Sequence, residues 1–288
     1  MNEPGKIAAE QSAEEKPFFQ VIIHSFFVIP FLIIVFGLIL FTAVNLLTRE
    51  QRSVYDYLED VKTGGLSKRW QGAFELSRIL ANPKLIPSDE RFVNELGKAF
   101  QEAKHDDSRV RQYLVLAMAR TGNKEFVKPI LEELETEKEE NIPAFLYALG
   151  MLKSDLAVDK IHQYVDHPKA LIRSMAVVAL GNIKDPRSTF FLQGALHDSE
   201  PNVQWGAALS LTQIGDASGK EILLQLLDRS YLSKFSEVDP DEQDNLMLKA
   251  VEASVKINDP ALNQKINELS QHDQNMKIRS SATKAMKK

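Results

Sequence analysis

The sequence predicts an all-α protein in which a single transmembrane helix precedes an α-solenoid, a stack of similar helix pairs. Two observations carry this prediction. A run of 32 residues near the start, 17–48, contains no Asp, Glu, Lys or Arg. The middle of the chain matches itself when it is shifted by 31 residues, and each copy has the apolar spacing of helices.

The charge-free run has the length and composition of a membrane span. As a helix, residues 26–47 would reach roughly 33 Å at about 1.5 Å per residue, which matches a hydrocarbon core of about 30 Å. Proline and glycine are both tolerated in membrane helices. We therefore assign residues 18–48 to a transmembrane helix, whose span residues include Phe26, Pro30, Gly37 and Leu47.

Two other interpretations of this run stay open. A cleaved signal peptide has a shorter apolar region, of roughly 7–15 residues, and then a small-residue cleavage site, which residues 43–49 do not show convincingly. A core helix of a soluble domain rarely needs this length without a charge. His24, the one ionisable group in the run, fits an interfacial histidine, or else a proton relay or a contact with a partner helix.

Lys and Arg near the two ends of the span predict its orientation. Two precede it, whereas five follow it by position 69: Arg49, Arg52, Lys62, Lys68 and Arg69. The positive-inside rule therefore favours the cytoplasmic side for the large C-terminal part, in a single-pass protein of the inner or plasma membrane. The opposite orientation, with that part outside or in a periplasm, is the alternative.

The composition of the rest of the chain excludes several function classes. The 288 residues carry a formal net charge of −5, which argues against nucleic acid because phosphate binding needs concentrated Lys and Arg. The absence of cysteine excludes disulfides, thiol nucleophiles and zinc sites of the Cys type. Residues 1–17 are polar, which predicts a disordered tail, and residues 49–66 form a linker that can be helical.

Each repeat unit has the pattern of two helices. In the clearest copy, apolar residues recur at the spacing of one buried helical face: Ile172, Met175, Ala176, Ala179, Leu180 and Ile183. Gly181 and Asn182 weaken helix continuation, and Asp185-Pro186 supplies a turn before a second helix over 187–197. One column of the repeat holds small residues that let helices approach closely: Ala117, Ala148, Ala179 and Ser210.

These units resemble HEAT repeats, in particular the short bacterial form called PBS-lyase HEAT-like repeats. The resemblance is carried by Ile172-Arg173, Ala176, Ala179-Leu180-Gly181, Ile183 and Asp185-Pro186, with partial copies at Val110-Arg111 and at 208–216. It implies a right-handed solenoid of about six helix pairs over residues 67–288. It also implies that the second helices, near 124–136, 155–166, 187–197 and 218–228, line the concave face and carry recognition.

The resemblance implies protein binding, because known members are mostly protein-binding solenoids and a minority act in attaching bilin pigments. The sequence has no H-E-x-x-H, no G-x-S-x-G and no phosphate-binding loop, so we expect no enzyme activity and no catalytic, cofactor or metal residues. The predicted function is a membrane-anchored scaffold or accessory subunit that recruits a protein partner, with no small-molecule substrate, in a membrane-associated complex. One alternative is a lyase-like or chaperone-type accessory subunit for a chromophore-bearing protein; another is a structural subunit of a membrane transport or protease complex.

Two segments are candidate partner contacts. An acidic cluster over 132–140, which includes Glu132 and Glu133, can bind a basic partner or be a solvated helix face. A 12-residue insertion within 229–243 carries Tyr231 and Phe235, and it can contact a partner or be a tolerated surface loop. Asp239 and Asp241 are expected to help start the helix that follows.

Overall fold

A computed structural model describes residues 24–48 and 52–287 of the chain, and all regular elements in these ranges are helices. The chain divides into two units, Met1–Arg52 and Ser53–Lys288. The predicted disordered tail, residues 1–17, lies outside the described residues, as does the start of the predicted span, residues 18–23.

The N-terminal unit contains one long apolar helix. A short π-helical turn, η1 (His24–Val28), leads into α2 (Ile29–Thr48), which includes Leu47. Pro30 is the second residue of α2, directly after η1, and Gly37 has open space around it. The side chains are exposed around the helix, Phe26 by 73% and Ile34 by 69%. Phe26–Val44 is long and apolar enough to cross a membrane, a test that a signal sequence near the N-terminus also passes.

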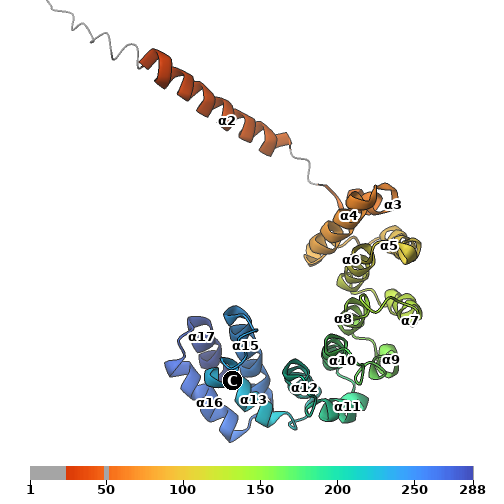
Figure 1. The fold of residues 1–288 in the computed structure, drawn as a ribbon, viewed down its shortest axis with the longest axis vertical. Helices are drawn as coiled ribbons and strands as arrows, with labels where there is room; N and C mark the ends of the chain where they lie inside the picture. The colour runs from red at the N-terminus through yellow and green to blue at the C-terminus, as the bar shows by residue number, and fades with distance from the viewer. Residues whose placement is uncertain (1–23, 49–51, 288) are drawn as a thin grey trace, which may run out of the picture. The chain divides into compact units, whose positions relative to one another are not determined.

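The C-terminal unit is a curved stack of helix pairs in two rows (Figure 1). The first helices of the pairs form one row: α4 (Leu66–Ile79), α6 (Ser108–Arg120), α8 (Ile142–Leu152), α10 (Ala170–Ile183) and α12 (Pro201–Ile214). The second helices form the other: α5 (Glu90–Glu102), α7 (Val127–Leu134), α9 (Val158–His162), α11 (Thr189–Ala195) and α13 (Lys220–Leu226). Short 3-10 turns, η4 (Lys124–Phe126), η5 (Asp155–Ala157) and η6 (Pro186–Ser188), lead into α7, α9 and α11.

The first helices, not the second, lie along the inner side of the arc, where Figure 1 shows α6, α8, α10 and α12. The expectation that the second helices line the concave face is therefore wrong. The first helices pack directly on one another along the row, whereas the second helices pack mainly on first helices. Glycine permits this approach: a Cβ on Gly150 of α8 would lie 2.7 Å from the Cα of Ala179 in α10. Closer packing in one row bends the stack toward that row.

The two ends of the stack depart from the regular repeat. At the N-terminal end, α3 (Val54–Thr63) packs against α4 and α5 and buries Leu58 and Val61, so the compact unit begins at Ser53 and includes most of the segment expected to be a linker. At the C-terminal end lie the short α14 and three longer helices: α14 (Arg229–Leu232), α15 (Pro240–Ile257), α16 (Pro260–His272) and α17 (Met276–Ala285). Asp239 caps α15, as expected, because its carboxylate accepts the backbone N–H of Asp241.

Candidate partner-binding surface

The first helices present a row of apolar side chains away from the second helices. In α10 the partly exposed residues Met175, Val178 and Asn182 recur at helical spacing, while the residues between them are buried against neighbouring helices. The same positions in the other first helices are also exposed or half-buried, except for the buried Gly206. We call their apolar members the inner-face stripe: Phe74, Tyr113, Leu116, Tyr147, Met151, Met175, Val178 and Leu209.

Aromatic rings are concentrated at the N-terminal half of this stripe. Phe74 of α4 is 37% exposed and meets Tyr113 of α6 edge-on, with ring centroids 5.2 Å apart. Tyr147 of α8 is 40% exposed. Aromatic side chains of this kind are enriched at the energetic centres of protein interfaces. The stripe therefore has the composition of a protein-binding surface.

The inner-face stripe is not among the surfaces predicted from the sequence, although the sequence contains one signal for it. Leu116, Tyr147, Val178 and Leu209 are each 31 residues apart, so they form an apolar column of the repeat. That column lies beside the buried ones, and the sequence alone does not separate an inner-face position from a core position. The structure separates them through their exposure.

The predicted acidic cluster is paired with cations from its own and from neighbouring repeats. Glu133 lies 3.2 Å from both Lys104 and Arg111. Further pairs join Glu135 to Lys160, Glu137 to Arg111, Glu139 to Lys169 and, in an exposed pair, Glu132 to Lys128. The hydrogen bond from Lys160 lowers the pKa of Glu135. Glu133 and Glu135 thus connect neighbouring helix pairs through Lys104 and Lys160. A contact of Glu132 or Glu133 with a partner stays a prediction.

Two arginines at equivalent positions of the repeat make structural contacts of this kind. The buried guanidinium of Arg111 lies over the Phe100 ring, 4.3 Å from its centroid, and donates to the carbonyl of Phe100 at 2.8 Å. Two periods later, Arg173 makes two hydrogen bonds to Asp198, of 2.7 and 2.8 Å. These bonds hold the pKa of the Asp198 carboxyl below its usual value. The Val-Arg and Ile-Arg pairs of the sequence are therefore structural.

The two aromatic residues predicted in the insertion pack on the core. Tyr231 accepts a hydrogen bond from the indole N–H of the buried Trp205 at 3.2 Å. Phe235 meets the same indole edge-on, with ring centroids 4.9 Å apart. Arg229 at the start of the insertion pairs with Asp273 at 2.7 Å. The insertion is thus fixed to the stack, and both aromatic side chains are half-buried; their contact with a partner stays a prediction.

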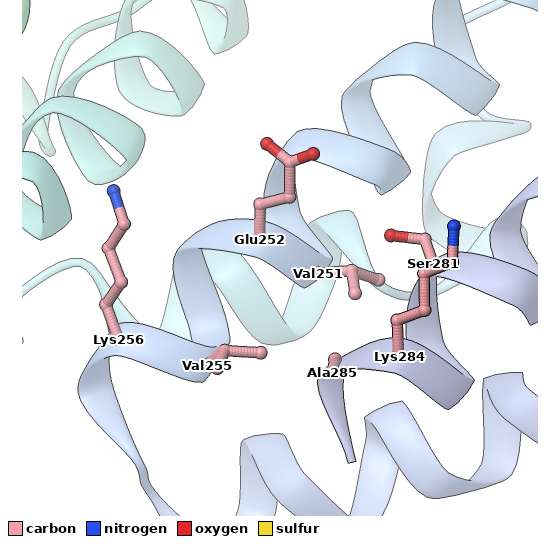
Figure 2. Close-up of a pocket in the computed structure, with 7 residues that line it drawn as sticks. All are labelled: Val251, Glu252, Val255, Lys256, Ser281, Lys284 and Ala285. Carbon is pink, nitrogen blue, oxygen red and sulfur yellow. The ribbon is translucent and has the colours of Figure 1, made fainter. Parts of the chain in front are cut away.

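A pocket of about 520 Å³ lies between α15 and α17 (Figure 2). Its lining combines apolar and charged side chains: Val251, Glu252, Val255, Lys256, Ser281, Lys284 and Ala285. None of these residues belongs to the inner-face stripe, and none is a site residue predicted from the sequence.

Comparison with known proteins identifies the fold. Residues 158–234 match the family model described as HEAT repeats. The complex of CpcE and CpcF of phycocyanin lyase from Nostoc sp. PCC7120 is similar at 17% identity and a TM-score of 0.57, over 83% of this chain and 96% of that chain. This chain folds as a HEAT-like solenoid. The predicted fold class is thereby confirmed, while at this identity the likeness carries no information about activity.

Weaker structural matches cover similar lengths. An engineered protein matches at 17% identity and a TM-score of 0.42, over 81% of this chain and 95% of its own. Human deoxyhypusine hydroxylase, solved in complex with glycerol, matches at 15% identity and a TM-score of 0.35, over 81% and 83%. No curated protein matches this chain.

Proposed function

We propose that this protein is a membrane-anchored scaffold that binds a protein partner through the inner face of its solenoid. The observation that carries the proposal is the inner-face stripe, in which four successive first helices present an apolar side chain at one repeat position: Leu116, Tyr147, Val178 and Leu209. Solenoids use such concave surfaces to bind extended partners. The proposed role is binding rather than catalysis.

The apolar helix supports the membrane part of this proposal. Its exposed phenylalanines, isoleucines and leucines would be unfavourable in water, at roughly 25 cal/mol per Å² of apolar surface, and favourable in lipid. Within this proposal Phe26–Val44 spans the inner or plasma membrane, and the Lys and Arg that follow it favour a cytoplasmic solenoid. The partner then belongs to a membrane-associated complex.

Site-specific photo-crosslinking tests the binding surface. A photoreactive phenylalanine analogue is placed at Tyr147 in the full chain, and a matched control carries it at Phe190 of α11, which is 79% exposed on the outer row. We expect one protein from native membranes to crosslink at position 147 and not at 190. Equal crosslinking at both positions, or at 190 alone, would contradict the proposed surface.

Alkaline extraction and cysteine labelling test the membrane part. The full chain should stay in the membrane pellet, and a chain without residues 18–48 should be released. Because the chain has no cysteine, Ser280→Cys gives one unique label site on the exposed side of α17. A membrane-impermeant maleimide should reach it in inside-out vesicles but not in right-side-out ones, and the reverse result would invert the orientation.

A further inference from the structure

The pocket between α15 and α17 lies beside one column of the repeat. Where first helices meet, one column of the repeat holds Gly150 and then Gly181, whose Cα atoms face Ala179 and Ser210. In α15, after the 12-residue insertion, the same column holds Val255. Figure 2 shows Val255 and Ala285 on the two sides of the pocket. The column also holds Thr212 in α12, and the half-buried Val255 and Ala285 give the cavity apolar walls.

The lining of the pocket is apolar at its base and charged at its rim. Val251 is buried, and Val255 and Ala285 add further apolar surface. Lys256 and Lys284 are exposed, and no carboxylate among the described residues lies within ion-pair distance of either. The volume of about 520 Å³ lies within the range of about 300–1,000 Å³ that ligand pockets have.

The sequence around α17 adds positive charge to this end of the stack. Residues 274–288 contain five basic residues and no Asp or Glu, in a chain whose net charge is −5: Lys277, Arg279, Lys284, Lys287 and Lys288. Arg111 and Lys160, by contrast, are paired with carboxylates. The rim carries two lysines and one glutamate, Glu252, so its charge is positive by one. Such a cavity favours a ligand that carries an apolar group next to negative charge.

We propose that this pocket binds an acidic peptide segment of a partner protein, with one apolar side chain of the segment in the cavity. Flanking Asp or Glu carboxylates pair with Lys256 and Lys284. The carboxylate of Glu252 accepts a backbone N–H of the segment. This site is separate from the inner-face stripe, and its test changes no residue of the stripe.

The probe is a displayed library of random peptides of about 12 residues, selected on the full chain in nanodiscs of zwitterionic lipid. We expect the selected peptides to share an apolar residue beside Asp or Glu. Anisotropy titrations of one labelled peptide then compare three variants. Ala285→Leu fills the cavity and Lys284→Glu reverses a rim charge, and each should weaken binding at least about tenfold. Lys277→Glu makes the same charge change outside the lining and should weaken it less than about threefold.

Circular dichroism confirms that each variant is folded, and Lys284→Glu alters an exposed side chain, so its effect is not a packing defect. The proposal is wrong if the selection yields no binder, if selected peptides lack acidic residues, or if Ala285→Leu binds like the wild type. Vesicles with anionic lipid test the alternative, in which this end of the stack binds lipid headgroups. If the full chain binds them with equal sensitivity to Lys277→Glu and Lys284→Glu and none to Ala285→Leu, this end of the stack is a lipid-headgroup surface and the peptide site is refuted.

Discussion

Replacing Gly181 by alanine tests whether close contact between first helices builds the stack. Gly181 lies in α10, and a Cβ added there would lie 2.7 Å from the Cα of Ser210 in α12. The Ser210 hydroxyl donates a buried hydrogen bond of 2.8 Å to the carbonyl of Val177 in α10. The new methyl group would therefore push the two helices apart and stretch this bond.

The magnitude follows from three opposing effects. Alanine is a better helix former than glycine by about 1 kcal/mol. Overpacking a tight contact costs about 1–3 kcal/mol, and loss of a buried hydrogen bond costs about 1–3 kcal/mol. The free energy of unfolding of Gly181→Ala should thus fall by about 1–5 kcal/mol, because the two costs together exceed the gain.

Urea unfolding of the full chain in detergent, followed by far-UV circular dichroism, measures this difference. Gly194→Ala is the matched control, because Gly194 lies within α11 with open space around it. This control should gain about 0.5–1 kcal/mol. The two substitutions must change the free energy of unfolding in opposite directions. If Gly181→Ala stabilises the protein as Gly194→Ala does, the first helices are not in close contact and the explanation of the curvature fails.

Three further predictions use the same unfolding assay. Arg111→Ala leaves the buried carboxylate of Glu137 without its cation and should cost about 3–5 kcal/mol, whereas the exposed Arg109→Ala should cost less than about 1 kcal/mol. Equal losses would show that the buried guanidinium has no special role. Because Arg173 lowers the folded-state pKa of Asp198, the stabilisation is complete above the unfolded pKa of about 4 and is lost as pH falls through the folded value. The stability gap between wild type and Asp198→Asn should therefore be largest near neutral pH and shrink below about pH 4, and a pH-independent gap would contradict this pairing. Phe235→Ala should cost about 1–3 kcal/mol, because it removes a half-buried ring that packs on a core indole. A loss below about 0.5 kcal/mol would instead indicate that the insertion is a tolerated surface loop.

The sequence was sufficient to predict the helix pairs because local signals determine them. Apolar spacing identifies each buried face, and Asp239 begins its helix through a hydrogen bond to a backbone two residues away. The function of Gly181 was not predictable in this way. Its local pattern predicts a weakened helix. Gly181 nevertheless lies inside α10, where the absence of a side chain lets α12 approach closely. A glycine that ends a helix and one that admits a neighbour have the same local pattern.

The curvature and the pairing of the acidic cluster depend on contacts between distant positions. Which row lies inside the arc is decided by which row packs more closely, and this involves pairs such as Gly150 and Ala179. Likewise, Glu135 and its partner Lys160 are 25 positions apart, so the cluster resembled a free acidic surface in the sequence. The repeat period can predict such ion-pair partners only when the packing of the two rows of helices is already known.

The inner-face stripe is informative because stacking alone does not require it. Positions that pack against neighbours, such as Gly150 and Ala179, are constrained by the stack itself. Positions that face away from the second helices have no such constraint, and polar residues such as Asn182 serve there equally well. Aromatic and aliphatic side chains at those positions lower the solubility of the protein. Packing buries only part of their surface, and Tyr147 remains two-fifths exposed. A partner that covers this surface gives the residues a function that the fold does not.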